Sequence, residues 1–320
     1  MKKLCLLVLC FSISIVAYSQ TIQRTILSHE GNLTQYNAAH WQDAFTDAVD
    51  GDIIYFTPGV FPGNLEITKS VSLIGAGISS TDCFHDNQTA MDYSVFCTTG
   101  QSTSIQGAIT IAIPGSKTLT SPIMEGIRVT GAQSITQPVT NLTFKRCQFG
   151  EQFSASATVT NLRMESCFVT RLFGTNVESA NFYNCYLEDL GDMWSGEGKL
   201  PAGTGFTNCH FGMLRTLKDC TLIKCIVHRN PDQATSITYK DCILCGHFND
   251  PGSMEENCVH KSNDEVTNDL ITNSYPGIGP FYGTAPFSFK PSQSYVSSST
   301  LNYNSSTKKL NVTMTIKKGE

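Results

Sequence analysis

A short pattern built around cysteine recurs along the middle of the chain and constrains the fold more than any other feature. In each copy an apolar residue lies five and three residues before a cysteine, and another lies two residues after it. The copies follow one another about every twenty residues. Self-similarity at such a period is typical of a solenoid. The copies are centred on Cys147, Cys167, Cys185, Cys209 and Cys242, and near Cys220 and Cys225 two registers compete.

The spacing inside the repeat predicts two short strands joined by a corner. In a strand, side chains alternate between two faces. In one continuous strand, the apolar residues before the cysteine would therefore face the opposite way from the one after it. The two residues before each cysteine are mostly polar, as in Tyr183-Asn184 and Thr207-Asn208, and Asn or Asp tolerates left-handed turn geometry. Both apolar sets then point inward, as in one coil of a parallel β-helix.

The cysteines themselves are predicted to form a structural ladder inside the coils. Stacked coils lie about 4.8 Å apart, and cysteine is a small, readily buried apolar residue. We prefer this interpretation to redox or metal chemistry, and Cys242 and Cys245 alone do not predict a zinc site, so no metal is expected. The expected ladder comprises Cys147, Cys167, Cys185, Cys209, Cys225 and Cys242.

Residues 1–19 have the pattern of a signal peptide, with two lysines, an apolar run and a small-x-small site before Gln20. The apolar run of about thirteen residues is too short for a membrane span. We therefore expect a secreted, periplasmic or cell-surface protein without a span. Eleven of the thirteen cysteines would remain after cleavage, an odd number that excludes complete pairing. Cys83 and Cys97 are the candidates for one disulfide closing a surface loop.

Upstream of the repeat, the spacing of apolar residues predicts a short helix over 38–49 that covers the first coil, followed by a strand from Ile53. The stretch from Trp41 through Gly51-Asp and Pro58-Gly59 to Leu73-Ile-Gly75-Ala-Gly77 resembles the start of right-handed parallel β-helix proteins of the pectate-lyase-like superfamily. The resemblance is close over residues 41–77 and looser as far as His260. The export signal and the segment around 277–287 look like exported, uncharacterised β-helix proteins of Bacteroidota.

The resemblance implies an all-β, right-handed parallel β-helix over residues 20–290. Residues 291–320 differ, because Leu310, Val312, Met314 and Ile316 alternate with polar residues. This segment is predicted to be a terminal β-hairpin or edge strand. It would serve as a cap on the solenoid or, alternatively, as a small attachment module.

The resemblance also raises polysaccharide cleavage as a possible activity. The motifs of polygalacturonase-like hydrolases are absent: no Asp-Asp occurs, and Gly246-His247 is followed by Phe248 rather than Gly. A lyase needs a cationic base beside a uronate carboxylate, for which Arg215, Arg229 and Lys240 are the candidates. Calcium is expected only under this lyase alternative, with Glu188, Asp189, Asp192 and Glu197 near Lys199 as the carboxylates.

The longest interval between ladder cysteines carries the best candidate for sugar binding. Trp194, in a Gly-rich loop with Asp192 and Glu197, can stack on a sugar ring or fold back over a gap between coils. His210 and His228 are expected as separate surface residues, although neighbouring coils could bring them together.

The sequence therefore predicts an exported β-helix without recognisable catalytic motifs. We expect a glycan-binding or cell-envelope structural protein, whose partner is a polysaccharide or a cell-surface glycan. A polysaccharide lyase acting on a uronic-acid polymer by β-elimination is the alternative. With 22 Lys and Arg against 27 Asp and Glu, the chain has no basic excess for nucleic acid.

Overall fold

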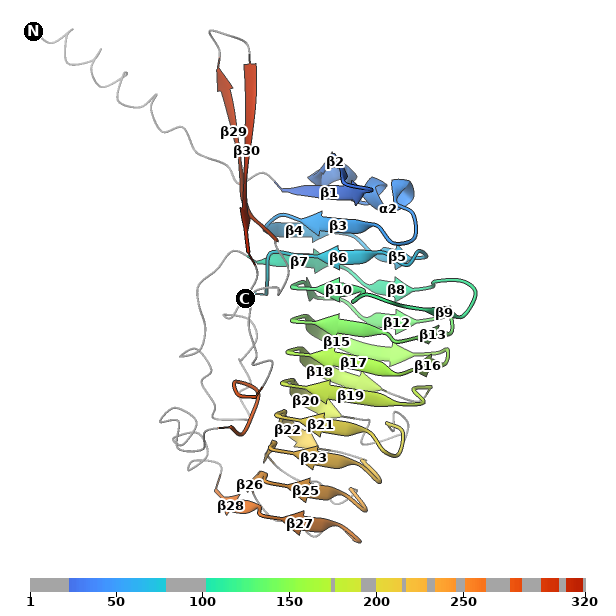
Figure 1. Cartoon of the computed structure of the whole chain (residues 1–320), viewed down its shortest axis with the longest axis vertical. Helices are drawn as coiled ribbons and strands as arrows, with labels where there is room; N and C mark the ends of the chain where they lie inside the picture. Colours follow the sequence, from blue (N-terminus) through green and yellow to red (C-terminus); the bar gives the residue numbers. More distant parts are fainter. Residues whose placement is uncertain are drawn as a thin grey trace, which may run out of the picture.

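The computed structural model describes residues 23–78, 102–173, 176–190, 200–214, 217–228, 234–245, 251–262, 277–283, 295–304 and 309–318. In these residues the chain forms a tall stack of parallel coils, and the first and last coils lie at opposite ends (Figure 1). The predicted all-β parallel β-helix is confirmed. No helix among the described residues is long and apolar enough to cross a membrane.

The first long sheet, sheet A, contains the strand before each corner. Its neighbours run parallel, except that β1 and β2 fold back antiparallel at the N-terminal end. In spatial order it consists of β2 (Asn32–Asn37), β1 (Arg24–His29), β3 (Ile53–Phe56), β6 (Ser72–Ile74), β10 (Met124–Glu125), β14 (Thr143–Lys145), β17 (Leu162–Glu165), β19 (Ala180–Tyr183), β21 (Gly205–Thr207), β23 (Thr221–Ile223), β25 (Thr238–Lys240) and β27 (Met254–Glu256).

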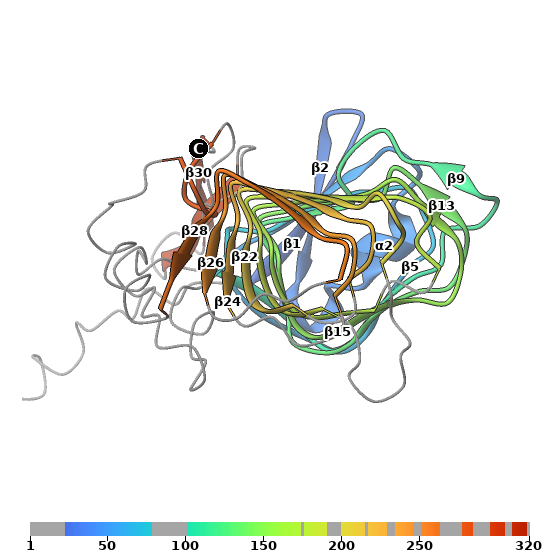
Figure 2. The same ribbon diagram turned by 90° about the horizontal axis from the view of Figure 1, so that it is seen from below.

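The second long sheet, sheet B, contains the strand after each corner. A small third sheet joins three adjacent coils. In the end view the coils lie almost on top of one another (Figure 2). Sheet B comprises β4 (Gly59–Pro62), β5 (Leu65–Ile67), β7 (Thr103–Gln106), β8 (Ile109–Ile111), β11 (Arg128–Val129), β12 (Gln133–Ile135), β15 (Gln148–Ala155), β18 (Phe168–Phe173), β20 (Tyr186–Leu190), β22 (His210–Leu214), β24 (Ile226–His228), β26 (Ile243–Cys245) and β28 (Val259–Lys261). The third sheet comprises β9 (Lys117–Thr118), β13 (Val139–Thr140) and β16 (Val159–Thr160).

The corner between sheets A and B has the left-handed geometry that the sequence predicted. The residue just before each ladder cysteine has a φ between 51° and 55° from Arg146 to Asn257. The structure also settles the ambiguous register, because β23 and β24 flank Cys225. Cys220 instead occupies the position five residues earlier, which is held by Leu142 and Ile237 in other coils, and its side chain is also buried.

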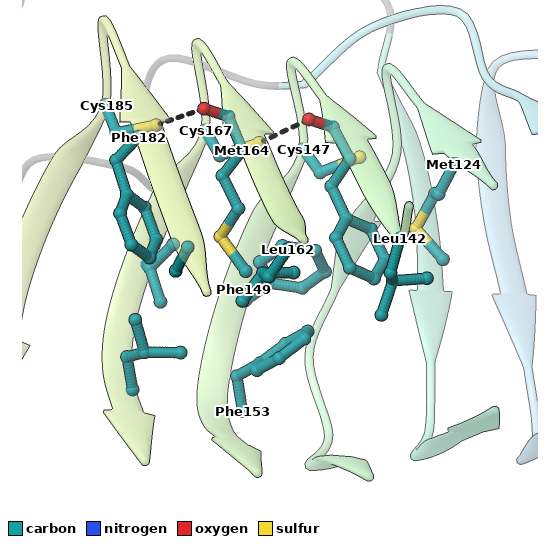
Figure 3. Packing of buried hydrophobic residues seen from close by; sticks show 14 of the residues in the cluster. Met124, Leu142, Cys147, Phe149, Phe153, Leu162, Met164, Cys167, Phe182 and Cys185 are labelled. Atoms are coloured by element: carbon teal, nitrogen blue, oxygen red, sulfur yellow. Dashed lines mark hydrogen bonds between the residues drawn. The ribbon is translucent and has the colours of Figure 1, made fainter. Parts of the chain in front are cut away.

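The ladder cysteines lie stacked inside the coils, beside rows of buried aromatic and aliphatic side chains (Figure 3). From Cys167 to Cys242, each ladder thiol reaches the backbone of the preceding coil: Cys167 Sγ donates to the Phe144 carbonyl at 3.6 Å, and Cys185 Sγ to the Met164 carbonyl at 3.4 Å. Burial raises the pKa of these thiols well above its usual value. Such thiols pack as small apolar side chains and are chemically inert.

At the N-terminal end the predicted continuous helix over 38–49 is wrong in its extent. The chain forms only η1 (Ala38–His40) and α2 (Asp43–Asp47). Between them Trp41 is almost fully buried, its indole N–H donates to the Pro62 carbonyl at 2.9 Å, and its ring packs against Phe56 and Phe61. Trp41 and Gln42 keep right-handed helical backbone angles, and the helix ends before Ala48, whose backbone is extended. The segment is therefore shorter than predicted but still covers the end of the stack.

The last coil ends the solenoid with charged side chains. Glu255 is in register with Tyr239, and His260 with Leu244, so both occupy positions that hold large apolar residues in earlier coils. His260 Nε2 lies 2.7 Å from Glu255 Oε2, and both side chains are exposed. A terminal coil with a polar outer side keeps a solenoid soluble. This hydrogen-bonded pair therefore closes the apolar core at its C-terminal end.

The C-terminal segment forms the expected antiparallel hairpin, made of β29 (Tyr295–Asn304) and β30 (Lys309–Lys317). It lies beside β3 at the N-terminal end of the stack rather than below the last coil (Figure 1). Two described segments after the last coil, residues 277–283 and the hairpin, therefore lie beside earlier coils, and we refer to them as the returning chain. The last coil itself covers the C-terminal end of the apolar core.

Candidate functional site

The outer side of sheet A, here called face A, is a half-exposed polar surface. Its residues are the outward members of strands that alternate with the buried rows. Half of them are small and uncharged, and the charged side chains lie toward both ends. From β14 to β25 they are Thr143, Lys145, Arg163, Glu165, Asn181, Tyr183, Gly205, Thr207, Thr221, Ile223, Thr238 and Lys240.

A cluster of two cations, a carboxylate and a tyrosine occupies one end of face A. Lys145 Nζ lies 3.0 Å from Glu165 Oε2, Arg163 also pairs with Glu165, and the Arg163 guanidinium lies 4.2 Å from the centre of the Tyr183 ring. Burial opposes ionisation of Glu165, but the hydrogen bonds from Arg163 and Lys145 outweigh it and lower the pKa of its carboxyl. The carboxylate therefore fixes both cations, and Arg163 in turn holds the tyrosine ring.

Beyond this cluster the side chains become small. A Cβ on Gly205 would lie 2.9 Å from Asn181 Oδ1, so the Asn181 amide occupies the space above the glycine.

Farther along face A, the predicted candidate Lys240 pairs with Glu256, with 2.8 Å between Lys240 Nζ and Glu256 Oε1. The hydrogen bond from Lys240 to Glu256 raises the pKa of the lysine. A raised pKa keeps the ammonium protonated, which suits charge pairing and works against a role as general base.

The outer side of sheet B, here called face B, differs because its central row is buried. Phe168 and Tyr186 are stacked 4.9 Å apart, Tyr186 meets the His210 ring edge-on at 4.9 Å, and His210 lies 4.8 Å from His228. The histidines are thus together and buried, so the expectation of two separate surface residues is wrong. Burial, and then the neighbouring His228, lower the pKa of His210 well below its usual value.

Part of the returning chain, residues 277–283, packs on the corner beside face B. The side-chain amide of Asn208 donates to the Gly277 carbonyl at 2.7 Å, and that of Asn184 donates to the Pro280 carbonyl at 2.9 Å. The Gly279 N–H donates to the Lys224 carbonyl at 2.9 Å. The backbones of Asn184 and Asn208 therefore form the left-handed corners, and their side chains anchor the returning chain.

Several residues predicted from the sequence fall outside the described part of the chain. They are Asp192, Trp194, Glu197, Lys199, Arg215, Arg229, Cys83 and Cys97. Of the predicted carboxylates on β20, Glu188 is half-buried, and the backbone of Asp189 pairs with those of Arg171 and Met213. Leu190 and Leu214 are register partners at the ends of β20 and β22. Within the described ranges, no group of three or more His, Cys, Asp or Glu side chains is arranged to hold a metal.

Sequence reasoning missed the Arg163–Tyr183 pair and the thiol at the end of the ladder, Cys258. The spacing of sixteen residues from Cys242 was a signal for Cys258, but Ser253, Glu255 and His260 are polar where earlier copies of the repeat are apolar. The Arg163–Tyr183 contact depends on which residues of neighbouring coils lie side by side, which the register of β17 and β19 fixes. Comparisons with protein-family models, curated proteins and solved structures gave no significant match. A functional proposal therefore rests on the geometry of this chain.

Proposed function

We propose that the chain is an exported glycan-binding protein that holds an extended polysaccharide or cell-surface glycan against face A. The observation that carries the proposal is the Arg163–Tyr183 pair beside Lys145 and Glu165, on a face of small polar side chains. A tyrosine ring offers an apolar surface to the C–H face of a sugar, and charged planar groups hydrogen-bond its hydroxyls.

The contrast between the two faces supports this choice. Face B buries its central row, whereas the outward residues of face A from Thr143 to Lys240 remain at least partly exposed. The coils repeat the same backbone about every 4.8 Å, so a flat face of this kind suits a long polymer better than a small molecule. No deep cavity is needed for such binding, and affinity would come from many weak contacts.

Binding is expected to depend on the cluster at the end of face A. The Arg163→Ala/Tyr183→Ala double variant should lose glycan affinity by about tenfold or more, equivalent to at least ~1.4 kcal/mol. The matched control is Lys117→Ala, which removes an exposed cation paired with Asp50 away from face A. Binding of wild type and both variants to a glycan array, followed by titration calorimetry on the best ligand, measures the effect.

Two results would contradict the proposal: folded wild-type protein that binds no glycan on the array, or a double variant that binds as tightly as the control. The lyase alternative is tested on the same samples, with and without Ca²⁺, by following ultraviolet absorbance for the unsaturated product of β-elimination from uronic-acid polymers. A signal would assign a lyase and direct mutagenesis to Arg215 and Arg229.

A further inference from the structure

The cysteine ladder has one accessible end. From Cys147 to Cys242 every ladder thiol is fully buried, whereas Cys258 in the last coil is partly exposed. The residues flanking Cys258 pair with those flanking Cys242: Ile243 is opposite Val259, and Lys240 is opposite Glu256. The Val259 N–H also donates to the Cys242 carbonyl at 2.9 Å. The two cysteines are therefore direct neighbours on adjacent coils.

This arrangement meets the geometric requirement for a disulfide. In-register neighbours on parallel strands lie about 4.8 Å apart, and disulfides join Cα atoms separated by about 4.4–6.8 Å. Both side chains belong to the inward set, so they point the same way. Among the described ladder thiols, only this pair combines an adjacent partner with access from solvent.

The two thiols are joined by a hydrogen bond. Hydrogen bonds with Cys225 and then Cys258 lower the pKa of Cys242, and the hydrogen bond with Cys242 raises the pKa of Cys258. The proton therefore stays on Cys258, and attack of Cys258 on a disulfide requires a base. His260 is two residues from Cys258 on the same face of β28, and Glu255 holds its ring at 2.7 Å. An imidazole at this position is the candidate base for the Cys258 thiol.

We propose that Cys258 and Cys242 form a thiol–disulfide exchange site at the C-terminal end of the solenoid, with external disulfides as substrates. The Cys258 thiol gives its proton to His260, and the resulting thiolate attacks one sulfur of the disulfide RSSR and expels RS⁻, which takes the proton from His260. Cys242 then attacks Cys258 Sγ, breaks the mixed disulfide and expels the second RS⁻, which takes up the proton of the Cys242 thiol. Overall, the two protein thiols are oxidised to one disulfide, and RSSR is reduced to two RSH.

The test exposes the folded, reduced chain to bis(2-hydroxyethyl) disulfide and maps the products by peptide mass spectrometry. Wild type should form a Cys242–Cys258 disulfide. The Cys242→Ser variant should stop at a mixed disulfide on Cys258, and Cys258→Ser should form neither product. Cys245→Ser is the control, because Cys245 is a buried cysteine outside the ladder whose pKa is raised to about 12 by burial. It should behave as wild type.

A separate measurement tests the role of His260. The Glu255–His260 pair is a positioning and proton-accepting unit, so His260→Gln should slow alkylation of Cys258 by iodoacetamide several-fold and move its pH–rate profile to higher pH. The proposal is overturned if native wild type yields no Cys242–Cys258 disulfide, or if the deeper ladder cysteines react as fast as Cys258. An unchanged pH–rate profile in His260→Gln would remove the histidine from the mechanism.

Discussion

Replacing Phe206 by alanine is expected to lower the free energy of unfolding by about 3–5 kcal/mol, the range typical of a fully buried phenylalanine. The Phe206 ring is stacked on Phe182 of the preceding coil at 4.9 Å and meets Phe211 of its own coil edge-on at 5.0 Å. The substitution therefore leaves a cavity at a junction between coils. Because a solenoid coil is stabilised only by its neighbours, the loss weakens the stack on both sides. Urea unfolding followed by circular dichroism measures the change.

Thr207→Ala is the matched control for this variant. Thr207 is the next residue of β21, but its side chain points to face A and is half-exposed, so its loss should change stability by less than about 0.5 kcal/mol. If Phe206→Ala and Thr207→Ala unfolded at the same urea concentration, the inward assignment of the phenylalanine row would be wrong. The comparison thus tests the parity of the repeat, on which the whole fold assignment rests.

That parity explains why so much of the fold could be predicted from the sequence. The apolar residues before and after each cysteine can both face inward only if a left-handed corner separates them, and Asn184 and Asn208 supply residues that tolerate it. The competing registers at Cys220 and Cys225 could not be separated in the same way, because both satisfy the local pattern. Stacking on the neighbouring coils decides between them, and it places Cys225 at the corner.

The candidate site was less predictable, for reasons that concern contacts between distant parts of the chain. On face B the outward positions of Phe168, Tyr186, Ile226 and Ile243 are apolar or aromatic, which is a sequence signal that something covers them. Among the described residues, the Ile226 side chain lies against Gly279. This contact joins segments that are far apart in the sequence, so no local pattern encodes it.

The N-terminal helix shows the opposite case, in which a local pattern predicted a longer helix than the structure contains. Apolar residues at helical spacing over 38–49 predicted one helix, but the chain forms a 3₁₀ turn and a short α-helix that ends before the extended Ala48. Local propensity is a weak prior for the exact extent of a helix that is packed against other elements. The function of the segment as a cover for the first coil did not depend on that detail.

The second large expected effect concerns the polar side chains of the last coil. The Glu255→Phe/His260→Leu double variant restores apolar residues at two inward positions and so extends the core to the exposed end of the stack. Strands β27 and β28 are then edges beside an uncovered apolar surface, and such edges pair with other chains. We expect end-to-end self-association, seen as an increase in molar mass by light scattering at concentrations where the wild type shows none.

Lys240→Leu/Glu256→Leu is the control, because it removes an ion pair of similar length from the outward side of the same region. If that control associated equally, surface hydrophobicity would be the cause. A double variant with the wild-type mass would show that the Glu255–His260 pair does not limit growth of the stack.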